Sequence, residues 1–559
     1  MRQFFYVNEN LNISIFRSSH THHTFKHFTM LFTKSSTSLT AAIIVATGML
    51  FSSCSKQMEN QNELTGPAFL EASKNRPAPK NTIFYALTSS NELVQYSSGN
   101  PLSELNSVNI TGLISATEKL LAIDFRPATG QLYGVSNQSR LYVINQLTGV
   151  ASAVSTTPFT PAINGTQVGF DFNPTVDRIR LVTNNDQNLR LNPETGMVAA
   201  TDMNINPAGA TVTGAAYTNS FSGATSTVLY DIDVERDLLV KQLPPNNGTL
   251  VTVGALGVQA VGEAGFDIAP DNSVAIAAIF GRGFEAGQPE ESNGNKYRFY
   301  YIDLATGEAQ NAGKTDRVIV GIAIPTNPVA YAVDQSNNLL IFNPTTSGVV
   351  TKPLTGLAMG EMIVGIDMRP ATAQLYALGS SSRIYTVNMS SGVSTMVGVG
   401  PFTPALSGTS FGFDFNPTVD RIRVVSNSGQ NLRLNPITGA VASSDPALNP
   451  GTPSVDGAGY TNSFPGATMT TLYDIDHATD RLHIQSPANA GTLDAGKPLG
   501  IDVSAGNGFD IGGRTNNAYG IFTVGGNNGL YSINLTTGAA SLAMPFPTSV
   551  RGFAVGLGF

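Results

Sequence analysis

The residues of this sequence that are best suited to bind a ligand are acids, amides and guanidinium groups in a set that occurs twice. They alternate with apolar residues such as Phe170, Phe172 and Ile179, so we expect one face of a β-sheet to be polar and the other packed. Guanidinium forks bind carboxylate, phosphate or sugar-acid groups through two hydrogen bonds. The alternative, which we favour, is a network of ion pairs between sheets, in which the arginines pair with Asp171, Asp177 or Asp186, because buried charges need partners. The candidate ligand-binding residues are Asp171, Asn173, Arg178, Arg180 and Arg190, with Asp414, Asn416, Arg421, Arg423 and Arg433.

A second group of acids recurs in matching contexts of the type Ile/Phe-Asp-Phe/Ile. Such aspartates could surround a channel and bind Ca²⁺, a hard cation that takes oxygen ligands. We favour a plainer role, in which each aspartate accepts a hydrogen bond from the turn that follows it, because a proline comes a few residues later at five of the six. The acids at Asp231 and Asp233 are a weaker candidate pair. Besides Asp171 and Asp414, the candidate metal ligands are Asp124, Asp267, Asp367 and Asp510.

Signatures of catalysis are few. No Gly-x-Ser-x-Gly elbow, zinc-spaced histidine pair or phosphate loop stands out. Beyond the N-terminal segment the only histidines are His477 and His483, and the aligned residues of the first repeat are Val234 and Val240. A histidine mechanism common to both repeats is therefore excluded.

The elements that position these residues follow from a long duplication. The run Gly-Phe-Asp-Phe-Asn-Pro-Thr-Val-Asp-Arg-Ile-Arg starts at Gly169 and again at Gly412, an offset of 243 residues. Within each repeat, a shorter period reads as four strands, for example 121–125, 131–135, 140–144 and 150–154, joined by turn residues. Four strands in about 40–50 residues, repeated in series, are typical of a β-propeller blade. The sequence therefore predicts an all-β fold with five blades per repeat.

Two closures of the propeller fit this pattern. In the one we favour, each repeat closes on itself, which gives two five-bladed rings of four-stranded blades over 81–324 and 326–559. The alternative is one ten-bladed ring. In either case the chain begins part-way through a blade, and the C-terminal run from Phe553 to Phe559 supplies a missing first strand. The first repeat also carries a polar insertion near 281–298, which we expect to protrude as a loop.

The N-terminal segment is predicted to be a targeting sequence. An apolar run of 13 residues, 39–51, is too short to span a membrane, which takes about 20, but suits a signal peptide. It is followed by Cys54, the one cysteine, in a context similar to a bacterial lipoprotein cleavage box. We therefore expect 1–53 to be a signal peptide, with 1–29 upstream of the true start at Met30. Lipid on Cys54 and a polar tether over 54–80 would then make the protein an outer-membrane lipoprotein.

Charge excludes one class of partner. The whole chain has a net charge of −8. Removal of 1–53 takes away four basic residues and one acidic residue, which leaves 27 basic against 38 acidic residues and a net charge near −11. Nucleic-acid binding needs clustered Lys and Arg, so we expect no nucleic-acid partner. A single cysteine also excludes a disulfide framework.

The repeated motifs resemble an uncharacterised bacterial family, the domain of unknown function number 4394. The resemblance rests on Ile-Asp-Phe-Arg-Pro-Ala-Thr-Gly-Gln-Leu-Tyr from Ile123, on the duplicated run from Gly169, and on Asn-Leu-Arg-Leu-Asn-Pro from Asn188. It covers most of both repeats and implies no activity. Because signatures of catalysis are few and a lipid anchor is expected, we expect a module that binds a small molecule, glycan or protein in the cell envelope. The runners-up are a metal-dependent hydrolase or lactonase and a purely structural envelope module.

Overall fold

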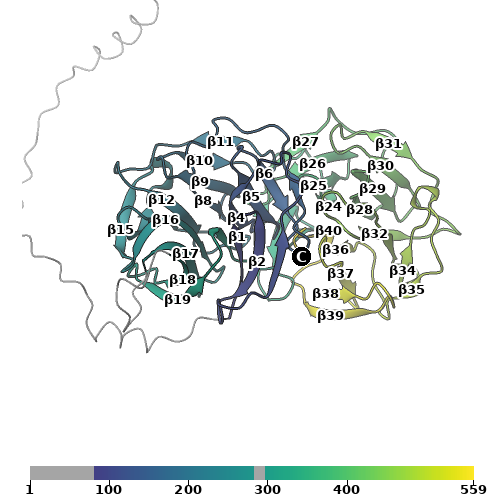
Figure 1. Ribbon diagram of the computed structural model, residues 1–559. Helices are drawn as coiled ribbons and strands as arrows, with labels where there is room; N and C mark the ends of the chain where they lie inside the picture. The colour runs from purple at the N-terminus through teal and green to yellow at the C-terminus, as the bar shows by residue number, and fades with distance from the viewer. Residues whose placement is uncertain (1–80, 283–295) are drawn as a thin grey trace, which may run out of the picture. The chain divides into compact units, whose positions relative to one another are not determined.

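The computed structural model describes residues 81–282 and 296–559. These residues form ten four-stranded antiparallel sheets (Figure 1). Within the described ranges the only helices are two 3₁₀ turns, Pro245–Asn247 and Ala488–Ala490. No helix there is long and apolar enough to cross a membrane. The expected signal peptide, Cys54, the tether and residues 283–295 of the polar insertion lie outside the described residues.

The first repeat, called the first copy below, holds five of the sheets. Its strands, sheet by sheet, are β20 (Ile319–Ala323), β1 (Ile83–Thr88), β2 (Glu92–Ser97) and β3 (Asn106–Asn109); β4 (Leu120–Phe125), β5 (Leu132–Ser136), β6 (Leu141–Ile144) and β7 (Ala151–Ala153); β8 (Val168–Asn173), β9 (Arg178–Thr183), β10 (Asn188–Leu191) and β11 (Val198–Thr201); β12 (Val212–Tyr217), β13 (Leu229–Asp233), β14 (Leu238–Gln242) and β15 (Leu250–Ala255); β16 (Gln259–Ile268), β17 (Ala275–Arg282), β18 (Lys296–Ile302) and β19 (Ala309–Thr315).

The second copy holds the other five sheets in the same order. Its strands are β40 (Val550–Val555), β21 (Ala330–Asp334), β22 (Asn338–Phe342) and β23 (Val349–Pro353); β24 (Ile363–Arg369), β25 (Gln374–Gly379), β26 (Arg383–Val387) and β27 (Ser394–Val397); β28 (Phe411–Asn416), β29 (Arg421–Ser426), β30 (Asn431–Leu434) and β31 (Val441–Ser444); β32 (Val455–Tyr460), β33 (Leu472–Asp476), β34 (Arg481–Ile484) and β35 (Lys497–Pro498); β36 (Gly508–Ile511), β37 (Ala518–Val524), β38 (Asn527–Ile533) and β39 (Ala540–Pro545).

The first strands of the five sheets in each copy are neighbours in a closed series. In the first copy β4 contacts β8, β8 contacts β12, β12 contacts β16, β16 contacts β20, and β20 contacts β4 again. In the second copy the series runs β24, β28, β32, β36, β40 and back to β24. Figure 1 shows β31, β35 and β39 at the periphery of the second copy, with β28, β32 and β36 closer to its centre.

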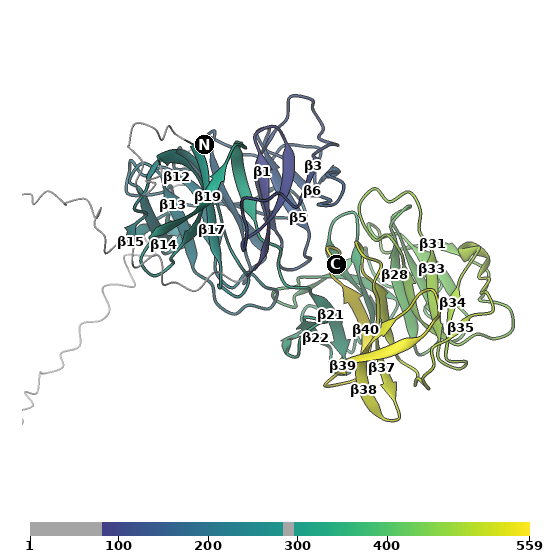
Figure 2. The ribbon, with the colours of Figure 1, turned by 60° about the horizontal axis from the view of Figure 1, so that its bottom comes forward.

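One sheet in each copy is completed by a strand from the end of that copy. Strand β20 pairs with β1, and β40 pairs with β21, through antiparallel ladders such as Ala332 opposite Phe553. Figure 2 shows β40 beside β21. A strand from the C-terminal run is present and pairs within the second copy, but it spans Val550–Val555 rather than the expected run from Phe553 to Phe559.

Glycine sets how closely the inner strands approach one another. Gly169 stands two residues before Asp171, and a Cβ there would lie 2.7 Å from the Cβ of Ala215 on β12. At Gly265 a Cβ would lie 2.9 Å from the backbone of Gly321 on β20. Contacts this short would force the strands apart. The recurrent Gly-x-Asp pattern therefore reflects the close packing of inner strands.

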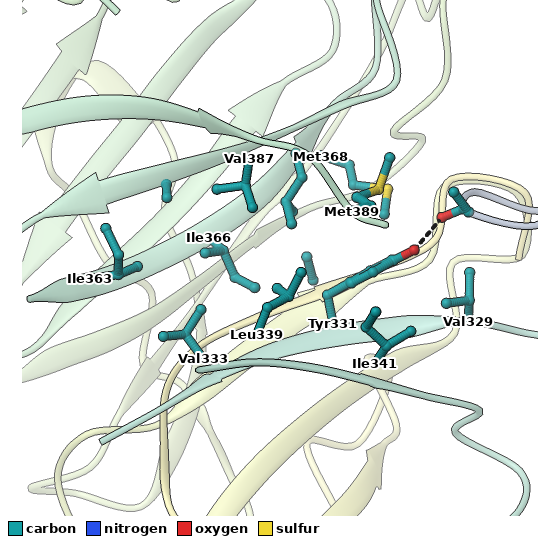
Figure 3. Packing of buried hydrophobic residues seen from close by; sticks show 14 of the residues in the cluster. Val329, Tyr331, Val333, Leu339, Ile341, Ile363, Ile366, Met368, Val387 and Met389 are labelled. Carbon is teal, nitrogen blue, oxygen red and sulfur yellow. Dashed lines mark hydrogen bonds between the residues drawn. The ribbon is translucent and has the colours of Figure 1, made fainter. Parts of the chain in front are cut away.

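Apolar side chains fill the space between adjacent sheets. Figure 3 shows one such cluster, in which Tyr331 and Leu339 from β21 and β22 face Ile366 and Met368 from β24. All four are at most 1% exposed. Each side chain of this size contributes about 1.5–3 kcal/mol on burial. The sheets therefore hold one another in place and fix the polar residues between them.

Candidate functional site

Arg180 and Arg423 lie inside the fold, where internal partners occupy their guanidinium groups. Arg180 is 2% exposed and reaches from β9 toward the next sheet. Its Nη1 donates to Asn188 Oδ1 at 2.6 Å and to Asp202 Oδ2 at 2.7 Å, and its Nη2 donates to Asn246 Oδ1 at 2.7 Å. Arg423 repeats the arrangement with Asn431, Asp445 and Asn489, each at 2.7 Å.

Arg190 and Arg433 meet the same acids from the solvent side. Arg190 donates two hydrogen bonds of 2.8 Å to the Asp202 carboxylate, and Arg433 donates two of the same length to Asp445. Burial alone would raise the pKa of Asp202, but the hydrogen bonds from Arg190 and Arg180 outweigh it and hold that pKa below its ordinary value. The pKa of Asp445 is lowered against its burial in the same way. These acids are therefore ionised partners of the arginines.

Asn173 and Arg178, with their copies Asn416 and Arg421, organise the turn between the first two strands of their sheets. The side-chain oxygen of Asn173 accepts from the Thr175 backbone N–H at 3.0 Å and from its hydroxyl at 2.7 Å. The Arg178 Nη1 donates to the Asp177 carbonyl at 2.7 Å. Asp177 has a φ of 51°, a conformation that Asp and Asn tolerate better than most residues. The second copy repeats these turn contacts.

Sequence reasoning did not find the acids and amides that complete this network. It named Asp171, Asp177 and Asp186 as partners for the arginines, whereas Arg180 pairs with Asp202 and Asn246. The missed residues have copies at the same offset of 243, namely Asp445 and Asn489. That shared offset was the one signal in the sequence that could have found them.

Asp171 instead belongs with the other inner-strand aspartates. In each copy three carboxylates offer oxygens that all lie within 4.8 Å of one another. The structure thus gathers residues that are 47 and 96 positions apart along the chain. All six are at most 5% exposed. We call each set an axial triplet; the members are Asp124, Asp171 and Asp267 in the first copy and Asp367, Asp414 and Asp510 in the second.

Each axial aspartate joins its own strand to the next inner strand. Asp124 accepts from the Phe125 N–H at 2.7 Å and from the Phe172 N–H of β8 at 2.8 Å. Asp171 accepts from the Tyr217 N–H of β12 at 3.1 Å. The prediction that each aspartate bonds the turn that follows it is therefore wrong, because these carboxylates accept from the backbone of the neighbouring inner strand.

Electrostatics set the axial triplets apart from the other acids. Burial and then the neighbouring carboxylates raise the pKa of Asp124 and Asp171 well above the ordinary value. Burial also raises the pKa of Asp267, and of Asp510 in the second copy, to about 7. Three carboxylates this close cannot all be ionised unless a cation lies between them. Without a cation, they must hold or share protons. A hard cation with oxygen ligands, such as Ca²⁺ or Mg²⁺, fits this donor set.

The inner strands β4, β8, β12, β16 and β20 also line a cavity of about 10 Å³. A cavity of that size has room for roughly one water. None of the three aspartates of the first axial triplet lines it.

The acids at Asp231 and Asp233 do not converge on a common ligand. Asp233 pairs with Arg236 at 3.1 Å. Asp231 is fully buried, and neither of its oxygens has a hydrogen-bond partner among the described residues. Burial raises the pKa of Asp231 to about 8, against the opposing charge of Arg180. Its copy Asp474 behaves in the same way.

Comparison with known proteins gives a family and no activity. A family model described as Domain of unknown function (DUF4394) matches residues 92–323 and 331–554. No curated protein matches the chain. Among solved structures, the extracellular domain of BT4673 from B. thetaiotaomicron matches with 12% identity and a TM-score of 0.23. That match covers 82% of this chain and 58% of the other chain.

Proposed function

The chain belongs to the family described as Domain of unknown function (DUF4394), and from that premise we propose that it is a cation-dependent binding module of the cell envelope. The scaffold would be two five-bladed β-propellers over 81–324 and 326–559. Each would hold a cation at its axial triplet. The proposal has three parts: the scaffold, the cation and the tether.

The scaffold proposal rests on the closed series of inner strands. Five four-stranded sheets per copy, each inner strand contacting two others, agree with a five-bladed ring. The pairing of β20 with β1 and of β40 with β21 gives each copy a complete set of strands. These pairings favour two rings over one ring of ten blades.

The cation proposal carries the function, and its support is the repetition of the axial triplet in both copies. A cation there would bind carboxylates from three sheets at once, and so couple closure of the ring to occupancy of the site. All six axial aspartates are at most 5% exposed, so a substrate would have little access to an ion held there. For this reason we favour binding over the runner-up, a metal-dependent hydrolase or lactonase.

The tether and the partner are further parts of the proposal. Lipid on Cys54 would hold the protein at the outer membrane, with 54–80 as the spacer. Net acidity argues against a nucleic-acid partner. The partner classes that remain are small molecules, glycans and proteins.

Thermal unfolding with and without Ca²⁺ tests the proposal. We expect Ca²⁺ to raise the melting temperature, and one member of a panel of sugars, peptides and lactones to raise it further only when Ca²⁺ is present. No member of the panel should be consumed. Metal-dependent turnover of a lactone would support the hydrolase, and no response to Ca²⁺ or to any compound would leave only the structural module.

A further inference from the structure

The second copy brings a serine, a histidine and an aspartate close together, outside the network and the axial triplet described above. His477 follows β33, and its Nε2 lies 3.3 Å from the hydroxyl of Ser454, which precedes β32. On the other side of the ring, Nδ1 lies 3.2 Å from Asp456 Oδ2. These separations are within the range in which a serine, a histidine base and an orienting acid act together, allowing for the looser contacts of a site without substrate.

Asp456 is held in place as an orienting acid would be. It is fully buried. Its Oδ2 accepts from the Gly506 N–H at 2.8 Å, and both its oxygens lie within 3.3 Å of the Asn507 side-chain nitrogen. Nδ1 of His477 has no hydrogen-bond partner of good geometry among the described residues, so its 3.2 Å contact with Oδ2 is electrostatic. The carboxylate favours the tautomer with the proton on Nδ1, because a carboxylate can only accept. In that tautomer the lone pair of Nε2 faces Ser454, as a general base requires.

Electrostatics support the same assignment of roles. The contact with Asp456 raises the pKa of His477, aided by the charge of Asp476. An imidazolium formed when the histidine takes a proton would therefore be stabilised. Ser454 and His477 are only partly buried, whereas Asp456 is inaccessible. Solvent can thus reach part of the serine and of the histidine.

The first copy lacks the acid and the histidine of this arrangement. At the offset of 243 residues it has Thr211 for Ser454, Thr213 for Asp456 and Val234 for His477. Thr213 accepts from the backbone N–H of Ala264, the residue that aligns with Asn507. The two copies thus differ at the acid, its side-chain donor and the base together, although the surrounding sheets are the same.

We propose that Ser454 is a nucleophile activated by His477 and Asp456, and that the second copy transfers acyl groups from small esters to water. Ser454 Oγ attacks the ester carbonyl carbon while its proton passes to His477 Nε2. The C–O bond to the alcohol breaks, and the alcohol leaves with that proton. Water then attacks the acyl-serine, releases the carboxylic acid and restores the hydroxyl. Ser454 and His477 touch the reacting atoms, whereas Asp456 positions the imidazole.

A fluorophosphonate probe and p-nitrophenyl acetate test this proposal on the full chain. We expect the probe to label Ser454, as located by mass spectrometry of peptides, and Ser454→Ala to abolish both labelling and ester hydrolysis. His477→Val introduces the residue that the first copy carries and should lower the hydrolysis rate about 10²–10⁴-fold. Asp456→Asn should lower the rate and shift its pH profile, which a purely structural role would not do.

The first copy supplies the control, because Thr211→Ala should leave labelling and rate unchanged. Circular dichroism melting of each variant separates loss of activity from loss of the fold. The proposal is overturned if the probe does not label Ser454, or if Ser454→Ala or the folded His477→Val protein keeps the wild-type rate. The acyl-transfer proposal does not depend on the axial triplets, so its test is independent of the test of the cation proposal.

Discussion

Replacing Arg180 with methionine should lower the free energy of unfolding by about 3–5 kcal/mol, the usual effect of removing one partner from a buried ion pair. The substitution leaves Asp202 with only its solvent-side contact to Arg190. It also removes the donors that satisfy Asn188 and Asn246. Urea denaturation followed by circular dichroism measures the change. Arg423→Met should give a loss of similar size in the second copy.

The matched control is Arg190→Met, which removes a partner of the same acid from the surface. Arg190 is 34% exposed, so its ion pair is screened and should contribute about 1 kcal/mol or less. If Arg180→Met instead left stability unchanged but abolished binding of an identified ligand, the buried network would be a ligand pocket. Equal losses of unfolding free energy in Arg180→Met and Arg190→Met would also contradict a stabilising role for the buried ion pair of Arg180.

In a chelator, stability should fall as the pH rises from about 4 to about 8. The pKa of Asp267 and of Asp510 is about 7 in the folded protein, above the ordinary 3.8. The folded state therefore binds more protons than the unfolded state across this window, and stability decreases with rising pH. Each shift corresponds to a cost on the order of 4 kcal/mol at pH 8, since one pKa unit is about 1.4 kcal/mol. Melting temperatures between pH 4 and pH 8 in EDTA check this.

The variant for this prediction is Asp171→Asn combined with Asp414→Asn. An amide oxygen can still accept from the Tyr217 N–H, as Asp171 does, while one charge leaves each triplet. The double variant should lose less stability than the wild type between pH 4 and pH 8 in EDTA. A pH dependence unchanged from the wild type would mean that the triplets do not titrate in this window.

Much of the fold could be predicted from sequence because its signals are local. Alternation of apolar residues and Gly, Pro and Asn turns predicted strands at 121–125, 131–135, 140–144 and 150–154, and the structure has strands at 120–125, 132–136, 141–144 and 151–153. The all-β class and the tandem repeat are confirmed by the ten sheets and by the two matched segments.

The side-chain partners were harder to predict because they are distant in the chain. Asp124 binds the backbone of Phe172, 48 residues later, and Arg180 reaches Asn246, 66 residues later. A strand pattern tells which face a side chain lies on, but not which neighbouring sheet covers that face. The register places Asp171 opposite Arg180, in agreement with the alternation, but the acid that pairs with Arg180 was missed.

The serine, histidine and aspartate of the second copy show a different limit. Comparison of the copies excludes a histidine mechanism common to both, but it does not test residues present in one copy only. In the sequence no motif connects Ser454 and Asp456 with His477. The antiparallel pairing of Val455 with Asp476, with a register shift between Val455 and Gly457, brings the three together.

Calcium binding measured by isothermal titration calorimetry at pH 8 tests the central claim most directly. We predict two sites per chain, one for each axial triplet. Asp171→Asn should remove one site, and the combination with Asp414→Asn should remove both. A chain that binds no Ca²⁺ or Mg²⁺, or a double variant that binds as the wild type does, would contradict the account.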